Sequence, residues 1–155
     1  MKKERVFEVC NGYEDKDIHI PERKTKYAAG YDIESAEDVV IKPFTNGMKP
    51  VLVKTGLKAK FPSDECLLLV NRSSNPVKRG LVLANSIGVI DADYYGNESN
   101  DGELLYAYYN FGENDYHISK GDIIGQAMFM KYLTTSNDVE NNNKRTGGIG
   151  STDKM

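Results

Sequence analysis

The sequence contains no tryptophan and only two cysteines and two histidines among its 155 residues. Cys10 and Cys66 are far apart and have neither metal-site nor redox-motif spacing. We therefore expect two reduced thiols in a cytoplasmic protein. His19 and His117, with so few thiols near them, exclude a zinc site of the usual kind.

Long hydrophobic runs are also missing. The longest, residues 66–70, is far too short to cross a bilayer, so we expect no membrane association. The basic start of the chain has no apolar segment behind it, which predicts no signal peptide. The net charge of −3 argues against a general nucleic-acid binder and leaves room for a small anionic ligand held by a few local cations.

Helical periodicity is scarce, and short alternating apolar segments recur instead. Residues 38–44, 49–61, 65–70 and 103–112 are typical of strands. Many short strands separated by turn signals predict a mostly β fold, a sandwich, jelly roll or barrel. One short helix is expected over residues 74–80, because Ser74 or Asn75 can cap it, Pro76 suits its first turn and Gly80 can end it.

The composition changes near Thr134. Residues 135–155 are polar and rich in Asn and Gly, with almost nothing to bury. We therefore expect a folded core over residues 1–134 and a mobile C-terminal arm over residues 135–155.

The segment GVIDADYYG, residues 88–96, leads from an apolar strand into two acids. If the strand continues, Asp91 and Asp93 share one face and Tyr94 points to the other, where it can form the wall of a pocket. A carboxylate at the end of an apolar strand is a candidate general base, since partial burial favours the protonated form of such a group. A solvated hairpin turn with acids at its tip is an equally good interpretation of this segment alone.

Two further segments suit an anionic ligand. In NRSSNPVKRGL, residues 71–81, an arginine, two hydroxyls and free backbone N–H groups precede the short helix and can converge on a phosphate. In RTGGIGST, residues 145–152, glycines allow backbone N–H groups to close on a phosphate beside Arg145. Taken singly, the first is also an ordinary capped helix and the second an ordinary disordered terminus.

YAAGYDIES and KGDIIGQAMF complete the set, with Asp32 among small residues and Gln126 on an apolar strand after a Gly-Asp turn. Taken in order, these five segments resemble the five motifs of the trimeric dUTP pyrophosphatases (dUTPases), over residues 27–152. The insert NESNDGELL after the third motif resembles the Gram-positive bacterial and phage forms. The resemblance implies a dUTPase-like β jelly roll that works as a homotrimer with shared active sites, each covered by the arm of a neighbouring subunit.

The implied reaction is Mg²⁺-dependent hydrolysis of dUTP to dUMP and pyrophosphate, which removes dUTP from the nucleotide pool and supplies dUMP for thymidylate synthesis. By resemblance, Asp91 is the general base that activates the attacking water. Asp32 acts on the magnesium shell through water. The expected substrate-binding residues are Arg72, Ser73, Ser74, Asn85, Gly88, Ile90, Tyr94, Gln126, Arg145, Gly148, Ile149, Gly150 and Ser151.

The roles within that set also follow from the resemblance. Asn85 and the strand that follows it read the polar edge of uracil, and Tyr94 packs on the deoxyribose and leaves no room for a 2′-hydroxyl. The residues of motif two contact the phosphate chain, and Gln126 of motif four contacts the phosphate chain or the attacking water. Those of the arm close on the γ-phosphate.

The sequence departs from the family pattern at three positions. Ile149 stands where much of the family has a base-stacking Phe, and Tyr95 is the nearest aromatic residue to replace it. Ile123 replaces a basic residue of motif four, and Asn71 replaces the Gly or Pro that usually opens motif two.

Two other functions fit the same pattern. A dCTP deaminase, or a bifunctional deaminase and dUTPase, shares the fold and much of the phosphate site. A non-catalytic nucleotide-sensing or regulatory protein could use the same scaffold.

Overall fold

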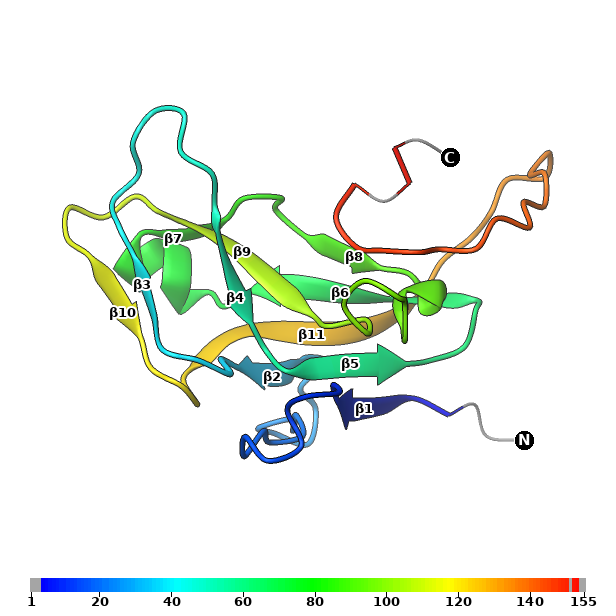
Figure 1. Cartoon of the computed structure of the whole chain (residues 1–155), viewed down its shortest axis with the longest axis horizontal. Coiled ribbons are helices and arrows are strands. Elements are labelled where there is room, and N and C mark those ends of the chain that lie inside the picture. The colour runs from blue at the N-terminus through cyan, green and yellow to red at the C-terminus, as the bar shows by residue number, and fades with distance from the viewer. Residues whose placement is uncertain (1–3, 151, 154–155) are drawn as a thin grey trace.

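The computed structural model describes residues 4–150 and 152–153. Within them it contains eleven strands and two single helical turns, η1 (Asn75–Arg79) and η2 (Ala92–Tyr94) (Figure 1). The strands are β1 (Val6–Val9), β2 (Tyr31–Glu34), β3 (Val39–Ile41), β4 (Val51–Lys54), β5 (Leu57–Lys60), β6 (Glu65–Asn71), β7 (Leu81–Leu83), β8 (Gly88–Ile90), β9 (Leu105–Asn110), β10 (Tyr116–Ile118) and β11 (Ile123–Lys131).

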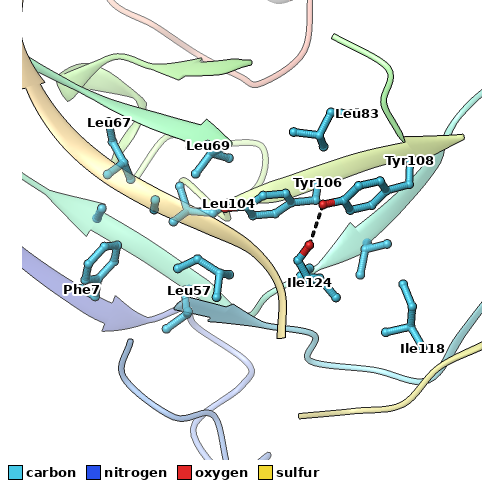
Figure 2. Close-up of a cluster of buried hydrophobic side chains, with 14 of the residues drawn as sticks. Phe7, Leu57, Leu67, Leu69, Leu83, Leu104, Tyr106, Tyr108, Ile118 and Ile124 are labelled. Carbon is cyan, nitrogen blue, oxygen red and sulfur yellow. Dashed lines mark hydrogen bonds between the residues drawn. The ribbon is translucent and has the colours of Figure 1, made fainter. Parts of the chain in front are cut away.

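The strands form antiparallel sheets that enclose one core. A four-stranded sheet has the order β2-β11-β6-β8, a three-stranded sheet has the order β4-β9-β7, and β1-β5 and β10-β3 are pairs. Leu67 and Leu69 of the first sheet and Tyr106 and Tyr108 of the second belong to the same buried cluster (Figure 2). The predicted mostly β fold is confirmed.

The short helix lies where the sequence predicts it. Ser74 is its N-cap residue, a proline stands in its first turn, and Gly80 ends it with φ at +68°. The turn η2 is not predicted: Asp91 and Asp93 lie at the start of a helical turn and not along an extended strand. This corrects the expectation that they share a strand face.

Tyrosine and glycine shape the core beside β11. The stacked rings of Tyr106 and Tyr108 have centroids 6.2 Å apart. The Tyr108 hydroxyl donates to the carbonyl oxygen of Ile124 at 2.6 Å (Figure 2). A Cβ at Gly125 would lie only 2.2 Å from Cε1 of Tyr106, so only glycine allows this close packing.

Both cysteines are buried and free, as expected for reduced thiols. Burial, as the largest cause, raises the pKa of the Cys10 thiol to about 12. No helix among residues 4–150 and 152–153 is long and apolar enough to span a bilayer. The same residues contain no group of three or more His, Cys, Asp or Glu side chains placed to hold a metal ion.

Candidate functional site

A pocket of about 230 Å³ lies where β8, β9 and the C-terminal arm meet. The arm leaves β11, turns outward and returns past β8 (Figure 1). The residues that line this pocket are Leu52, Leu69, Asn85, Gly88, Val89, Ile90, Asp91, Tyr94, Leu105, Ala107, Arg145, Gly148, Ile149, Gly150 and Thr152. Third-motif and arm residues that lie far apart in the sequence therefore share one pocket within a single chain. Here the arm lies over the pocket of its own chain, whereas the resemblance implies that it covers the site of a neighbouring subunit.

Strand β8 carries the third motif to this pocket. It pairs with β6, with Gly88 opposite Leu69 and Ile90 opposite Leu67. A Cβ at Gly88 would lie 3.1 Å from Cβ of Leu69, so glycine lets β8 approach β6 closely. The strand ends at Ile90, and Asp91 caps the turn that follows, its carbonyl oxygen accepting from the amide of Tyr94 at 3.1 Å.

Arg145 of the arm contacts both acids of the motif. Its Nη2 donates to Oδ2 of Asp91 at 2.6 Å and its Nε donates to Oδ1 of Asp93 at 3.0 Å. The side chains of Asp91 and Asp93 are 55% and 59% exposed, so the partial burial expected for Asp91 is not found. The carboxylate of Asp91 is therefore paired with the guanidinium of Arg145 and is not enclosed by apolar side chains.

Tyr94 forms a wall of the pocket, as the sequence predicts. The residue is buried, and its hydroxyl donates to the carbonyl oxygen of Glu103 at 2.8 Å. Burial is the largest cause that raises the pKa of this phenol. Tyr95 lies elsewhere: its hydroxyl donates to Glu8 at 2.5 Å and the Nζ of Lys58 lies over its ring. The expectation that Tyr95 replaces the missing aromatic residue of the arm is thus not met within this chain.

A second group of expected residues lies on β2 and β11. Gln126 is opposite Asp32 in the sheet, and its Nε2 lies 3.4 Å from Oδ1 of Asp32. A Cβ at Gly30 would lie 3.0 Å from Oε1 of Gln126, so this glycine leaves space for the amide. Motifs one and four are therefore in contact with each other.

Motif two follows β6 on the same sheet. Nη1 of Arg72 donates to the carbonyl oxygen of Ile123 at 3.0 Å, which holds the arginine next to motif four. Ser73 is exposed, and Oγ of Ser74 accepts from Arg79 at 3.1 Å. Arg72, Ser73 and Ser74 thus form one group with Asp32 and Gln126, away from the pocket.

The two groups lie at opposite ends of β6. Ile90, just before Asp91, pairs with Leu67, whereas Arg72 follows Asn71 at the other end of the strand. Residues in an antiparallel strand advance by about 3.4 Å each, so Asp91 and Arg72 are separated by roughly 15–20 Å along the sheet. A single chain does not bring all the expected residues together.

Six pocket residues were missed in the sequence: Leu52, Leu69, Val89, Leu105, Ala107 and Thr152. The alternation of β9 contained the signal for two of them, because Leu105 and Ala107 must face away from the core if Tyr106 and Tyr108 face into it. Ile149 lines the pocket but is 79% exposed. Ser151, an expected substrate-binding residue, lies outside the described residues.

Comparisons with known proteins agree on one family. The dUTPase family profile matches residues 16–153. The deoxyuridine 5′-triphosphate nucleotidohydrolase of Lactococcus lactis is 47% identical over 152 residues, covering 97% of this chain and 98% of that protein.

Solved structures that resemble this chain are also dUTPases. The dUTPase of Streptococcus mutans has a TM-score of 0.78 and 40% identity, over 85% of this chain and 99% of that one. The dUTPase of phage phi11 of S. aureus has a TM-score of 0.71 and 25% identity, over 89% of this chain and 97% of that one.

Proposed function

This chain belongs to the dUTPase family and hydrolyses dUTP to dUMP and pyrophosphate, and we propose that it does so in active sites shared between the three chains of a homotrimer. The observation that carries the proposal is the division of the motif residues between the two ends of β6. Asp91 and the arm lie at one end, and Arg72 lies at the other with Gln126. A neighbouring chain that presents its Arg72 group to this pocket completes the site.

An apolar sheet face beside the pocket supports the same assembly. On the outer face of β4-β9-β7, Leu52, Val82 and Phe111 are 42%, 37% and 57% exposed. Phe44 packs on Phe111 and on Tyr109, with ring centroids 5.0 Å and 5.3 Å apart. A continuous apolar surface of this kind is typical of a protein–protein interface.

Within such a site, Asp91 accepts a proton from the water molecule that attacks the α-phosphorus, and pyrophosphate departs. Asp91 lies at the mouth of the pocket with its carboxylate exposed to solvent, which suits contact with a water molecule. Arg145 exchanges Asp91 for the γ-phosphate when the nucleotide binds, because a triphosphate offers it more negative charge. Ser73 and Arg72 of the neighbouring chain hold the phosphate chain.

The base and sugar occupy the pocket between β8 and the arm. Asn85, Gly88 and Ile90 line the pocket, where Asn85 and the backbone of the other two pair with the polar edge of uracil. Crowding at this edge excludes the methyl group of thymine. Tyr94 packs on the deoxyribose and excludes a 2′-hydroxyl. Gly148, Ile149, Gly150 and Ser151 belong to the arm segment that covers the nucleotide. In the trimer this arm comes from a neighbouring chain and docks where the chain's own arm lies here.

Magnesium is the proposed cofactor. Asp32 and Gln126 offer oxygen ligands of the kind that Mg²⁺ prefers, and Mg²⁺ at phosphate sites is often held by substrate oxygens, waters and only one or two carboxylates. The residues present therefore fit a nucleotide-borne ion that Asp32 orients through water. When bound, the ion would offset part of the charge of the triphosphate.

The cellular role follows from the reaction. Hydrolysis lowers the dUTP pool and supplies dUMP for thymidylate synthesis, and two free buried thiols suit the reducing cytoplasm. The net charge of −3 argues against a general nucleic-acid binder.

Pyrophosphate release from dUTP, dCTP, dTTP and UTP, each with and without Mg²⁺, tests substrate and cofactor together. We expect release from dUTP alone, and only with the metal. Ammonia release from dCTP would instead indicate the deaminase, and no reaction on any nucleotide would indicate a binding protein. Equal rates with EDTA present would refute the need for magnesium.

Shared sites can be tested by co-expressing two inactive chains, Asp91→Asn and Arg72→Ala. In random trimers of the two chains, about a quarter of the sites would combine an intact Asp91 from one chain with an intact Arg72 from another. We therefore expect the mixture to regain about a quarter of wild-type activity, whereas each variant alone stays inactive. Mixed trimers that regain no activity would show that Asp91 and Arg72 serve the same site from one chain.

A further inference from the structure

The segment between η2 and β9, residues 95–104, contains most of the NESNDGELL insert and is an ordered hydrogen-bonded loop. Asn97 is only 6% exposed. Its Oδ1 accepts from the backbone amides of Ser99 and Asn100 at 3.0 Å and 3.2 Å. Its Nδ2 donates to the carbonyl oxygen of Tyr94 at 2.9 Å, which ties the loop to the residue that forms the pocket wall.

The far side of the loop is anchored to the body of the protein. Oδ2 of Asp101 accepts from Nζ of Lys58 at 2.8 Å and from the amide of Asn11 at 2.9 Å. Oε1 of Glu103 accepts from the amide of Gly56 at 3.0 Å. A loop held on β5 and on the N-terminal segment can position whatever it contacts on its other side.

What it contacts there is the tip of Tyr94. Nδ2 of Asn100 donates to the Tyr94 hydroxyl oxygen at 2.7 Å, while the hydroxyl donates to the carbonyl oxygen of Glu103 at 2.8 Å. Both hydrogen-bonding roles of this buried phenol are therefore taken by the loop. Oδ1 of Asn100 meanwhile accepts from the amide of Gly102 at 3.2 Å, which fixes the amide orientation.

The arm meets the same pair of groups. A Cβ placed on Gly148 would lie 3.4 Å from the Tyr94 hydroxyl oxygen and 3.6 Å from Nδ2 of Asn100. The backbone of the arm thus lies against the Asn100–Tyr94 contact, at the point where it closes the pocket.

We propose that Asn100 is a positioning residue that fixes the ring of Tyr94 and the docking place of Gly148, and thereby sets the preference for dUTP over UTP. This inference rests on the proposed packing of Tyr94 against the deoxyribose. A ring held at its hydroxyl cannot tilt to admit a 2′-hydroxyl. Loss of the hydrogen bond from Asn100 would allow the Tyr94 ring to tilt, and it would not remove any group that contacts the phosphates.

The test compares Asn100→Asp and Asn100→Ala with Glu98→Ala, a change at an exposed position of the same loop. Aspartate keeps the oxygen that accepts from the amide of Gly102 and from Nδ2 of Asn97, and puts an anionic acceptor where the donor to Tyr94 stood. Alanine removes both groups without adding charge. One hydrogen bond is worth roughly a threefold to tenfold change in an equilibrium or rate. We expect both Asn100 variants to lower the ratio of kcat/KM for dUTP to that for UTP by about this factor, with dUTP kcat nearly unchanged, and Glu98→Ala to keep the wild-type ratio.

Tyr94→Ala and Tyr94→Phe separate the two levels of the inference. In the Tyr94→Phe background the changes at Asn100 should no longer alter the ratio, because the hydroxyl is gone. Suppose that Tyr94→Ala lowers the dUTP-to-UTP ratio but Asn100→Asp and Asn100→Ala leave it at the wild-type value. The positioning role of Asn100 is then refuted, while the role of Tyr94 stands. If Tyr94→Ala leaves the ratio unchanged, the proposed role of Tyr94 fails and the role of Asn100 fails with it.

Discussion

Replacing Asp91 with asparagine is expected to lower kcat for dUTP by about 10²- to 10⁴-fold, because general-base assistance contributes about that factor to a rate. Asparagine keeps the shape of the side chain but does not accept a proton from water. Nucleotide binding should persist, since the base and sugar contact other pocket residues. Single-turnover kinetics with dUTP, and titration with a non-hydrolysable analogue, measure the two quantities separately.

Asp93→Asn is the matched control for this change. Asp91 and Asp93 contact the same guanidinium, so each substitution removes one ion pair with Arg145. Only the first removes the proposed base. If Asp93→Asn loses as much kcat as Asp91→Asn, the ion pairs and not the base account for the loss, and the mechanism is wrong.

Replacing Gly125 with alanine is expected to lower the free energy of unfolding by about 1–3 kcal/mol or more, the usual cost of overpacking a core. The added methyl group would lie 2.2 Å from Cε1 and 2.8 Å from Cζ of Tyr106, whose residue is only 1% exposed. β11 is held between β6 and β2, which limits how far its backbone can move away from the ring. Urea denaturation followed by circular dichroism measures the loss.

A double substitution identifies the cause. In a Tyr106→Leu background the shorter side chain should absorb the methyl group, so the further cost of Gly125→Ala should fall. An equal cost in both backgrounds would mean that the ring is not what alanine meets. Gln126 of motif four follows Gly125 directly in the chain. The dUTPase activity of the same variants therefore shows whether motif four tolerates a change in the packing of Gly125.

The sequence predicts most of the strands because the alternation of apolar and polar residues is a local pattern. It does not predict that one of the segments divides into two strands. Residues 49–61 are typical of a single strand, yet Gly56 adopts φ at +65° and separates β4 from β5. The two strands then pair with β9 and β1, in different sheets. The glycine is visible in the sequence, whereas its backbone angle depends on the partners that the strands find.

The sequence suggests which residues belong to the candidate site but not where each of them lies in the folded chain. Motif order predicts that Asp91 and Arg72 are functional, but only the pairing of β8 with β6 shows that they lie apart in one chain. Period-two reasoning assumed that the strand continues past Ile90, where the chain instead turns at Asp91. Nothing in the sequence distinguishes Asn100 from the other polar residues of its loop. Its proposed role depends on contacts with Tyr94 and Gly148 that only the folded chain forms.

The contact of Arg145 with Asp91 and Asp93 is an ion pair that dissolved salt can weaken. Both carboxylates are more than half exposed, at 55% and 59%. Dissolved ions therefore screen their attraction to the guanidinium, with a Debye length of about 8 Å at physiological salt. Rising salt is therefore expected to weaken the attachment of the arm to the third motif.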